Sequence, residues 1–495
     1  MVWNCRKCKG KRELRMIKKS MFIFVFLLGG TIGKLTADES LWSVRMAESV
    51  MTRHPSGYGN WDYVTGTVLR GFEELWRVTG DERYFNYIQK TVDRSVMASG
   101  NILDYRLSDY NLDEIREGCD CLFMFQQTAE EKYKKAADLL RSQLKSQPRT
   151  NEGGFWHKQR YPWQMWLDGL YMGGPFYTQY CVMFDDSAGL NDALNQYIFM
   201  EDHARDPDTG LLYHGWDESK EESWADPETG HSPSFWGRAV GWYAMALVDA
   251  LDFIPQEHKN RNTLIQIFQR LCDAMAQVQD TSGVWWQVLD QGNREGNYLE
   301  SSVSCMMTYA IAKGIRKGYL DASWQEVAEK AYQGILNLFI VENANGTISL
   351  TQTCLTAGLG NGRDGSYDYY VNQTSISTND GKAVGPFITA SIEMERMQTP
   401  VPSEKRLNPE RIQLNNYPNP FNAQTTVVVA VPAAGQIDLT IVNILGKTVK
   451  AWKESSSAEG TVCFSFDASV LPGGLYIAQL IFDSNKVNHS MIYLK

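Results

Sequence analysis

Apolar residues recur at helical spacing through most of the chain, from about residue 41 to residue 397. The pattern comes in pairs: Trp61–Val78 is helical, Thr79-Gly80-Asp81 interrupts it, and Tyr84–Val96 resumes it. A glycine at a helix end, followed by an aspartate at the next start, indicates a helical hairpin. Further helices are predicted at 41–53, 112–127, 163–181, 188–203, 235–253, 260–279, 300–317, 323–340 and 384–397.

About a dozen helices over residues 41–397 can form six hairpins that close on themselves. The pattern therefore predicts an all-α (α/α)6 barrel, whose loops at one end form a cleft. A superhelical solenoid is the alternative, but the helix pairs differ too much in sequence to be tandem repeats.

The pattern changes after residue 397. Residues 398–416 contain three prolines among charged neighbours and show no periodicity, which is typical of a linker. Short runs rich in branched and aromatic residues follow, separated by glycine turns, and they predict a small all-β sandwich over 417–495. These runs are Thr425–Val431, Ile437–Asn443, Thr461–Phe466 and Leu475–Phe482.

The first 37 residues are predicted to be an export signal. Nine basic residues and one acid surround an apolar run, Met21–Leu28, and small residues lead to Ala37. The run is shorter than the ~20 apolar residues of a membrane span, so we expect no integral membrane protein. Without this segment the formal charge is about −18, which argues against a nucleic-acid partner.

Composition adds two points. Hydrophobic residues make up 43% and charged residues 21% of the chain, so a folded protein with a large core is expected. Seven scattered cysteines follow the export signal, an odd number that predicts buried thiols rather than a disulfide framework.

The first candidate for chemistry is Asp168, a lone carboxylate among Trp163, Trp166, Leu170 and neighbouring aromatic residues. Removing water from a carboxylate raises its pKa and allows it to hold a proton near neutral pH. The alternative is an aspartate that caps a helix or binds a buried amide. The adjacent Gly169 and Gly173-Gly174 would leave room for a ligand.

Three other segments carry candidate groups, each with a structural alternative. Asp113 is either a second acid or a helix-start residue favoured by the helix dipole. His214, between aromatic residues, is either catalytic or structural. Trp236 and Arg238 fit a junction of loop and helix, where the arginine could clamp a substrate carboxylate, or they are a core tryptophan with a surface arginine.

The tail resembles the C-terminal sorting domains of the type IX secretion pathway. The resemblance rests on Tyr417-Pro418-Asn419-Pro420-Phe421-Asn422, on Gly473-Gly474-Leu475-Tyr476 and on the terminal Lys495. It implies recognition by the type IX secretion machinery through residues 417–495. It also implies a Gram-negative bacterium that exports the protein through the periplasm, to the medium or the cell surface. A carbohydrate-binding sandwich is the alternative.

The helical region resembles the unsaturated rhamnogalacturonyl hydrolases of glycoside hydrolase family 105, which have an (α/α)6 barrel. The matching segments are His157-Lys158 with Tyr161, Met165–Met172, Tyr213–Asp217 and Trp236–Trp242. The resemblance implies that Asp168 is the catalytic acid and base and Asp113 the second active-site carboxylate. It implies a sugar site lined by Trp61, Tyr63, His157, Lys158, Tyr161, His214, Trp236, Arg238 and Trp242.

The implied reaction is hydration of the C4–C5 double bond in the unsaturated galacturonyl residue that pectin lyases leave at the non-reducing end. One carboxylic acid protonates C4 and then, as carboxylate, takes a proton from the water that adds to C5. Neither a metal nor another cofactor is expected, since H-E-x-x-H and EF-hand spacings are missing. Alternatives are a family 88 glucuronyl hydrolase, a conventional glycosidase or lyase, and a non-catalytic sugar-binding protein.

Overall fold

The computed structural model describes residues 41–398 and, with short gaps at 418, 420, 445, 457–459 and 483–484, residues 412–494. The predicted export signal and most of the predicted linker lie outside the described residues. In the part that is described, no helix is long and apolar enough to cross a membrane.

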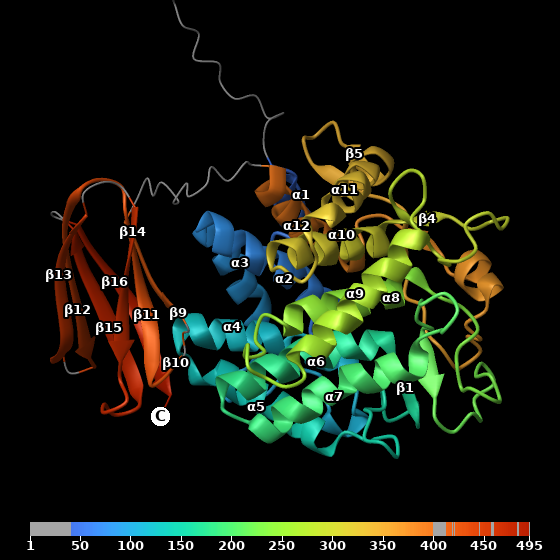
Figure 1. Ribbon diagram of the computed structural model, residues 1–495, viewed down its shortest axis with the longest axis horizontal. Coiled ribbons are helices and arrows are strands. Elements are labelled where there is room, and N and C mark those ends of the chain that lie inside the picture. The colour runs from blue at the N-terminus through green and yellow to red at the C-terminus, as the bar shows by residue number, and fades with distance from the viewer. Residues whose placement is uncertain are drawn as a thin grey trace, which may run out of the picture. The chain divides into compact units, whose positions relative to one another are not determined.

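Residues 41–398 form twelve α-helices (Figure 1). Six of them follow one another around a closed ring, because each contacts the next and the last contacts the first. These inner helices are α2 (Tyr63–Thr79), α4 (Gly118–Thr128), α6 (Leu167–Met183), α8 (Gly237–Ala250), α10 (Ser301–Arg316) and α12 (Gly381–Gln398). The all-α (α/α)6 barrel predicted from the sequence is confirmed.

The other six helices pack outside the ring, each against an inner helix. They are α1 (Trp42–Arg53), α3 (Glu82–Val92), α5 (Glu131–Ser146), α7 (Ser187–Ala204), α9 (Arg261–Gln277) and α11 (Gln325–Phe339). The two layers differ in sequence because their surroundings differ: every residue of α8 is buried, whereas α5 buries one face only.

The hairpin turns follow the local chemistry that predicted them. Gly80 ends α2 in the left-handed conformation, with φ 65°, and its N–H donates to the Trp76 carbonyl. Asp81 then caps α3 by accepting from the Arg83 N–H. One boundary differs from the prediction: Gln164–Trp166 form strand β1, which pairs with β2 (Gly215–Asp217), so α6 begins only at Leu167.

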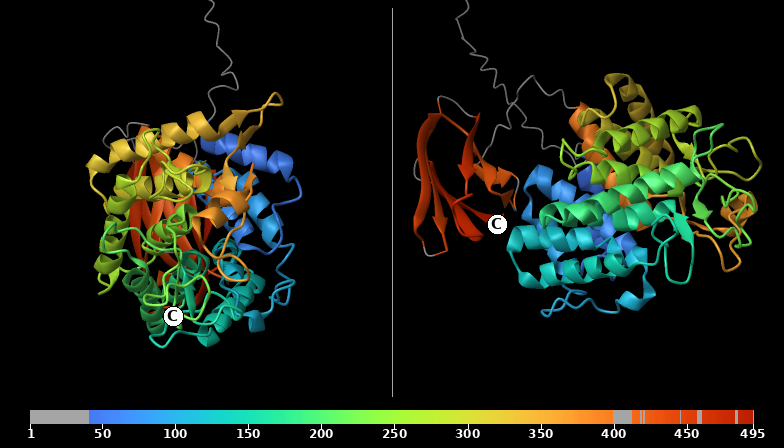
Figure 2. Two further views of the ribbon diagram at one scale, coloured as in Figure 1. Left: turned by 90° about the vertical axis from the view of Figure 1, so that its right-hand side faces the viewer. Right: turned by 60° about the horizontal axis from the view of Figure 1, so that its bottom comes forward.

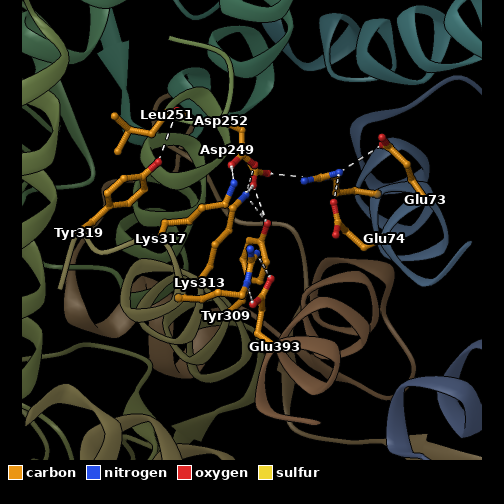
Figure 3. A network of polar contacts seen from close by, with 12 residues as sticks. Glu73, Glu74, Asp249, Leu251, Asp252, Tyr309, Lys313, Lys317, Tyr319 and Glu393 are labelled. Atoms are coloured by element: carbon orange, nitrogen blue, oxygen red, sulfur yellow. Dashed lines mark hydrogen bonds and ion pairs between the residues drawn. The ribbon is translucent and has the colours of Figure 1, made fainter. Parts of the chain in front are cut away.

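The inner helices run in the same direction, and charged residues gather at both ends of the barrel. Near the C-terminal ends, a buried ion network links α2, α8, α10 and α12 (Figure 3). Lys313 Nζ lies 2.7 Å from Asp249 Oδ1 and 2.6 Å from Asp252 Oδ2, and Tyr309 donates to Asp249. Burial acts against the charge of Lys313, but the two carboxylates outweigh it and raise the pKa of the lysine.

The C-terminal region is a sandwich of two sheets with a core of its own. One sheet has the order β10-β16-β15-β12-β13 and the other the order β14-β11-β9. The strands are β9 (Gln413–Tyr417), β10 (Phe421–Asn422), β11 (Gln424–Val431), β12 (Gly435–Asn443), β13 (Thr448–Ser456), β14 (Gly460–Asp467), β15 (Gly474–Phe482) and β16 (Asn485–Leu494). The predicted β-sandwich is confirmed; β9, β10, β13 and β16 were not predicted.

Candidate active site

The candidate site lies at the N-terminal ends of the inner helices, where the connecting loops meet. Strand β1 leads into α6 at this end and β4 (Leu299–Glu300) leads into α10; the left view of Figure 2 faces this end. Helix N-termini carry partial positive charge, so this end of the barrel favours negatively charged groups.

Asp113 lies in a short 3-10 helix, Leu112–Ile115, just before α4. Its carboxylate forms an ion pair with Lys158 and lies 3.2 Å from His157 Nε2. Burial alone would raise the pKa of Asp113, but the Lys158 ammonium and His157 outweigh it and hold the pKa below its usual range. Asp113 is therefore an anion at neutral pH.

A row of stacked rings extends from this pair. The His157 ring stacks on Trp166 with 4.4 Å between ring centroids, and Trp166 stacks on Tyr161 at 4.8 Å. Backbone hydrogen bonds hold the row in place: His157 N–H donates to the Gln164 carbonyl and Leu112 N–H donates to the His157 carbonyl. The second bond ties the row to the segment that carries Asp113.

Asp168 lies in the first turn of α6 and faces a different partner. Its Oδ2 is 3.0 Å from Nε2 of His214, and its side chain is 13% exposed. Within the described residues no lysine or arginine lies within ion-pair distance of Asp168. On the other side of the imidazole, His214 Nδ1 is 2.6 Å from the hydroxyl of Tyr370. The two aspartates thus have different environments, one beside a cation and one beside an imidazole.

Trp236 and Arg238 lie behind His214. The Trp236 ring contacts His214 at 4.7 Å, and the Arg238 guanidinium lies over the Trp236 ring at 4.9 Å. Both terminal nitrogens of Arg238 donate to backbone carbonyls, those of Cys354 and Leu355. Arg238 is 1% exposed, so the structure places it as a support for the 354–355 segment, with its terminal nitrogens already engaged.

Three predicted residues lie at the margin of the group. Trp61 Nε1 donates to the carbonyl of Glu114, next to Asp113. Tyr63, partly exposed, meets Trp242 edge to face at 6.3 Å. Trp242 itself is 1% exposed and stacks on Tyr171, so it lies in the core below the site.

The structure therefore joins seven of the predicted residues through direct contacts: Asp113, His157, Lys158, Tyr161, Asp168, His214 and Trp236, with Trp166 between them. Sequence reasoning missed Tyr370 and Gln287, which hold His214 and Trp236 from a distant part of the chain. No local motif signals either residue. Among the described residues, no group of three His, Cys, Asp or Glu side chains could hold a metal ion.

The glycines after Asp168 keep space beside α6, both for neighbouring side chains and for a small cavity that they line. A Cβ at Gly169 would lie 3.1 Å from Nδ1 of His157, and one at Gly174 would lie 2.2 Å from the Tyr197 hydroxyl. They allow neighbouring side chains to approach α6. A small cavity beside Gly169 and Gly173 is lined by residues such as Leu112 and Met165 and by no carboxylate, so it is not where the acid chemistry takes place.

Comparison with known proteins identifies both regions. Residues 42–398 match the profile of Glycosyl Hydrolase Family 88, and residues 415–494 match that of the Secretion system C-terminal sorting domain. A solved family 105 glycoside hydrolase of C. acetobutylicum is 45% identical, with a TM-score of 0.70; the match covers 72% of this chain and 100% of that one.

Two curated relatives are also similar. The protein Atu3128 of Agrobacterium fabrum is 38% identical over 45% of this chain and 97% of its own length. The unsaturated rhamnogalacturonyl hydrolase YesR of Bacillus subtilis is 28% identical over 51% of this chain and 70% of its own length.

Proposed function

The chain belongs to Glycosyl Hydrolase Family 88, and on this premise we propose that it removes the unsaturated galacturonyl residue from rhamnogalacturonan lyase products. The name of the Bacillus subtilis relative supports the choice of substrate. The observation that carries the proposal is the pairing of an ionised Asp113 with an Asp168 whose ion-pair partner, in the part of the chain that the structure describes, is an imidazole and not a lysine or arginine.

In the proposed reaction, Asp168 as a carboxylic acid gives its proton to C4 of the unsaturated sugar. Positive charge then develops at C5, where the anionic Asp113 stabilises it. The Asp168 carboxylate next takes a proton from water as the water oxygen bonds to C5, so the acid is restored. The resulting hemiketal opens, the bond to the rest of the chain breaks, and no group attacks the anomeric carbon.

The row His157–Trp166–Tyr161 supplies flat apolar surface beside the two acids, as sugar-binding sites commonly do. Lys158 is the cation best placed to bind the uronate carboxylate, because only one of its three N–H donors is needed for Asp113. Arg238, assigned to substrate by the family resemblance, would act through the segment that it supports.

The test is to follow the ultraviolet absorbance of the conjugated double bond in unsaturated galacturonyl-rhamnose oligosaccharides. The wild-type chain should consume the absorbance, and Asp168→Asn should abolish the activity with the fold retained. Asp321→Asn removes a carboxylate from the connection between α10 and α11 and should leave the rate unchanged.

Two outcomes favour other functions. Faster turnover of an unsaturated glycosaminoglycan disaccharide would assign the chain to the glucuronyl hydrolases. Binding of the oligosaccharides without loss of absorbance would make it a sugar-binding protein.

The sorting domain suggests where the reaction takes place. We propose that residues 415–494 direct the chain through the type IX secretion route, so that the barrel meets its substrate outside the cell. Fractionation of the native host should find the protein in the medium or on the cell surface, and a strain without type IX secretion should retain it.

A further inference from the structure

Asp168, His214 and Tyr370 form a continuous series of contacts from three separate parts of the chain. Nε2 of His214 lies 3.0 Å from Asp168, and Nδ1 lies 2.6 Å from the Tyr370 hydroxyl. His214 and Tyr370 are fully buried. The sequence pattern assigns no role to Tyr370.

The position of Tyr370 is fixed by several contacts of its own. It lies in a single π-helical turn, Tyr369–Gln373, a rare element that occurs often at functional sites. Its ring stacks on Trp236 with 5.2 Å between centroids and 14° between planes. Gln287 donates to the Tyr370 backbone carbonyl and accepts from Trp236 Nε1, so one amide joins the backbone of Tyr370 to the ring on which Tyr370 stacks. The hydroxyl is thereby held at Nδ1 of His214.

A neutral imidazole has one N–H donor and one acceptor nitrogen, and the partner of one nitrogen decides which is which. Burial raises the pKa of Tyr370 well above its ordinary value, so its hydroxyl keeps its proton. Within the described residues, the only hydrogen bond of this hydroxyl is to His214. A phenol with one such partner is best satisfied by donating, which leaves Nδ1 as the acceptor.

We propose that Tyr370 is a positioning residue that places the imidazole N–H of His214 on Nε2, toward Oδ2 of Asp168, and leaves Oδ1 of Asp168 to carry the catalytic proton. The tautomer of His214 does not depend on the proposed function; only the role given to Oδ1 of Asp168 rests on it. Nε2 and Oδ2 lie 3.0 Å apart but are not aligned for a hydrogen bond, and such bonds in active sites commonly tighten when substrate binds.

The opposite tautomer would have a different consequence. With the N–H on Nδ1, Nε2 would be an acceptor, and a protonated Asp168 would donate its proton to Nε2 instead of to C4. The tautomer therefore decides whether the acid can act on the substrate.

The direct test measures the tautomer in the full chain labelled with 15N-histidine. The chain has seven histidines, and His214→Gln identifies the signals of His214. The imidazole nitrogen shifts of the wild type should show the N–H on Nε2, and Tyr370→Phe should produce a mixture of both tautomers. A wild type with the N–H on Nδ1, or a Tyr370→Phe variant with unchanged shifts, overturns the inference. This measurement needs no substrate, so it stands even if the proposed substrate is wrong.

The kinetic test compares Tyr370→Phe with Tyr332→Phe, which removes a buried hydroxyl from α11. Both variants keep their rings. Tyr370→Phe should lower kcat by about 10–100-fold, the usual cost of removing the partner that orients a functional histidine, with KM changed less than about threefold. Tyr332→Phe should retain the wild-type kcat. If the wild type turns over substrate and Tyr370→Phe is equally fast, the positioning role is refuted. If the wild type is inactive, the proposed function fails, and the tautomer measurement alone decides whether Tyr370 positions His214.

Discussion

Lys158→Met tests whether the ionised state of Asp113 is needed for the reaction. The Lys158 and Asp113 side chains are 13% and 19% exposed, so solvent screens their ion pair only weakly. Burial pushes the pKa of Asp113 upward, and Lys158 and His157 offset this effect, so removal of the lysine leaves only His157 to oppose burial and raises the pKa. A neighbouring opposite charge lowers a carboxyl pKa by about 1–3 units, equivalent to about 1.4–4 kcal/mol.

The expected result is a shift of the pH dependence rather than a uniform loss. Activity requires Asp113 to be ionised, and its pKa rises in Lys158→Met, so the acid limb of kcat against pH should move upward by about 1–3 pH units. The loss of kcat relative to the wild type should therefore be largest at acid pH and should disappear as the pH rises towards neutral. KM should also increase if the lysine binds the uronate carboxylate.

The assay is the loss of double-bond absorbance from about pH 4 to pH 9, with two controls. Lys158→Arg retains a cation at the same position and should keep the acid limb near its wild-type pH. Lys134→Met makes the same substitution at the Lys134–Asp138 pair on α5 and should change nothing. An acid limb of Lys158→Met that coincides with the wild type would refute the role of Asp113, and a raised KM alone would leave Lys158 as a substrate ligand only.

Three further predictions concern stability and domain organisation. Lys313→Met should lower the free energy of unfolding by about 3 kcal/mol in denaturant titrations, because it removes the buried cation between Asp249 and Asp252 and leaves them only Arg70 and Lys317. A loss below about 1 kcal/mol would contradict this. Burial raises the pKa of Asp252, but Lys313 and Lys317 outweigh it and lower that pKa. The ionised Asp252 therefore stabilises the fold above about pH 4, and this contribution is lost as the pH falls. In Asp252→Asn the free energy of unfolding should consequently decrease less steeply with falling pH than in the wild type. A chain ending at residue 398 should keep its melting temperature and activity, since barrel and sandwich have separate cores, and failure of this truncation to fold would contradict it.

Local sequence patterns predicted the parts of this protein that local interactions determine. The helical period and the caps at Gly80 and Asp81 predicted the hairpins, since both depend on residues a few positions apart. The contiguous segment around Asp168 predicted the acid and its aromatic neighbour Trp166. The extent of α6 was predicted less well, because residues 164–166 pair with a distant strand and that pairing overrides the helical pattern.

The partners of the two acids could not be predicted in this way. Lys158 is 45 residues from Asp113, and Tyr370 is 156 residues from His214, so tertiary packing and not the local sequence brings each pair together. The same holds for Arg238: the sequence shows a cation beside a tryptophan, but the carbonyls of Cys354 and Leu355 that engage it are more than a hundred residues away. These contacts lie in loops that have no period of their own.

The candidate site and the buried ion network thus lie at opposite ends of the barrel, one serving the reaction and the other stability. At the N-terminal ends of the inner helices, Asp113 comes from a 3-10 helix, Asp168 from the first turn of α6 and Tyr370 from a π-helical turn. Their geometry depends on helices that keep their relative positions. At the C-terminal ends, Lys313 and its two carboxylates join α8 to α10 in a buried network, where a cation is held by two anions rather than by solvent. A substitution in that network removes no group from the site. Below its lowered melting temperature, Lys313→Met should thus keep kcat within about twofold of the wild type, and a large loss of kcat in a folded variant would mean that the network also sets the geometry of the acids.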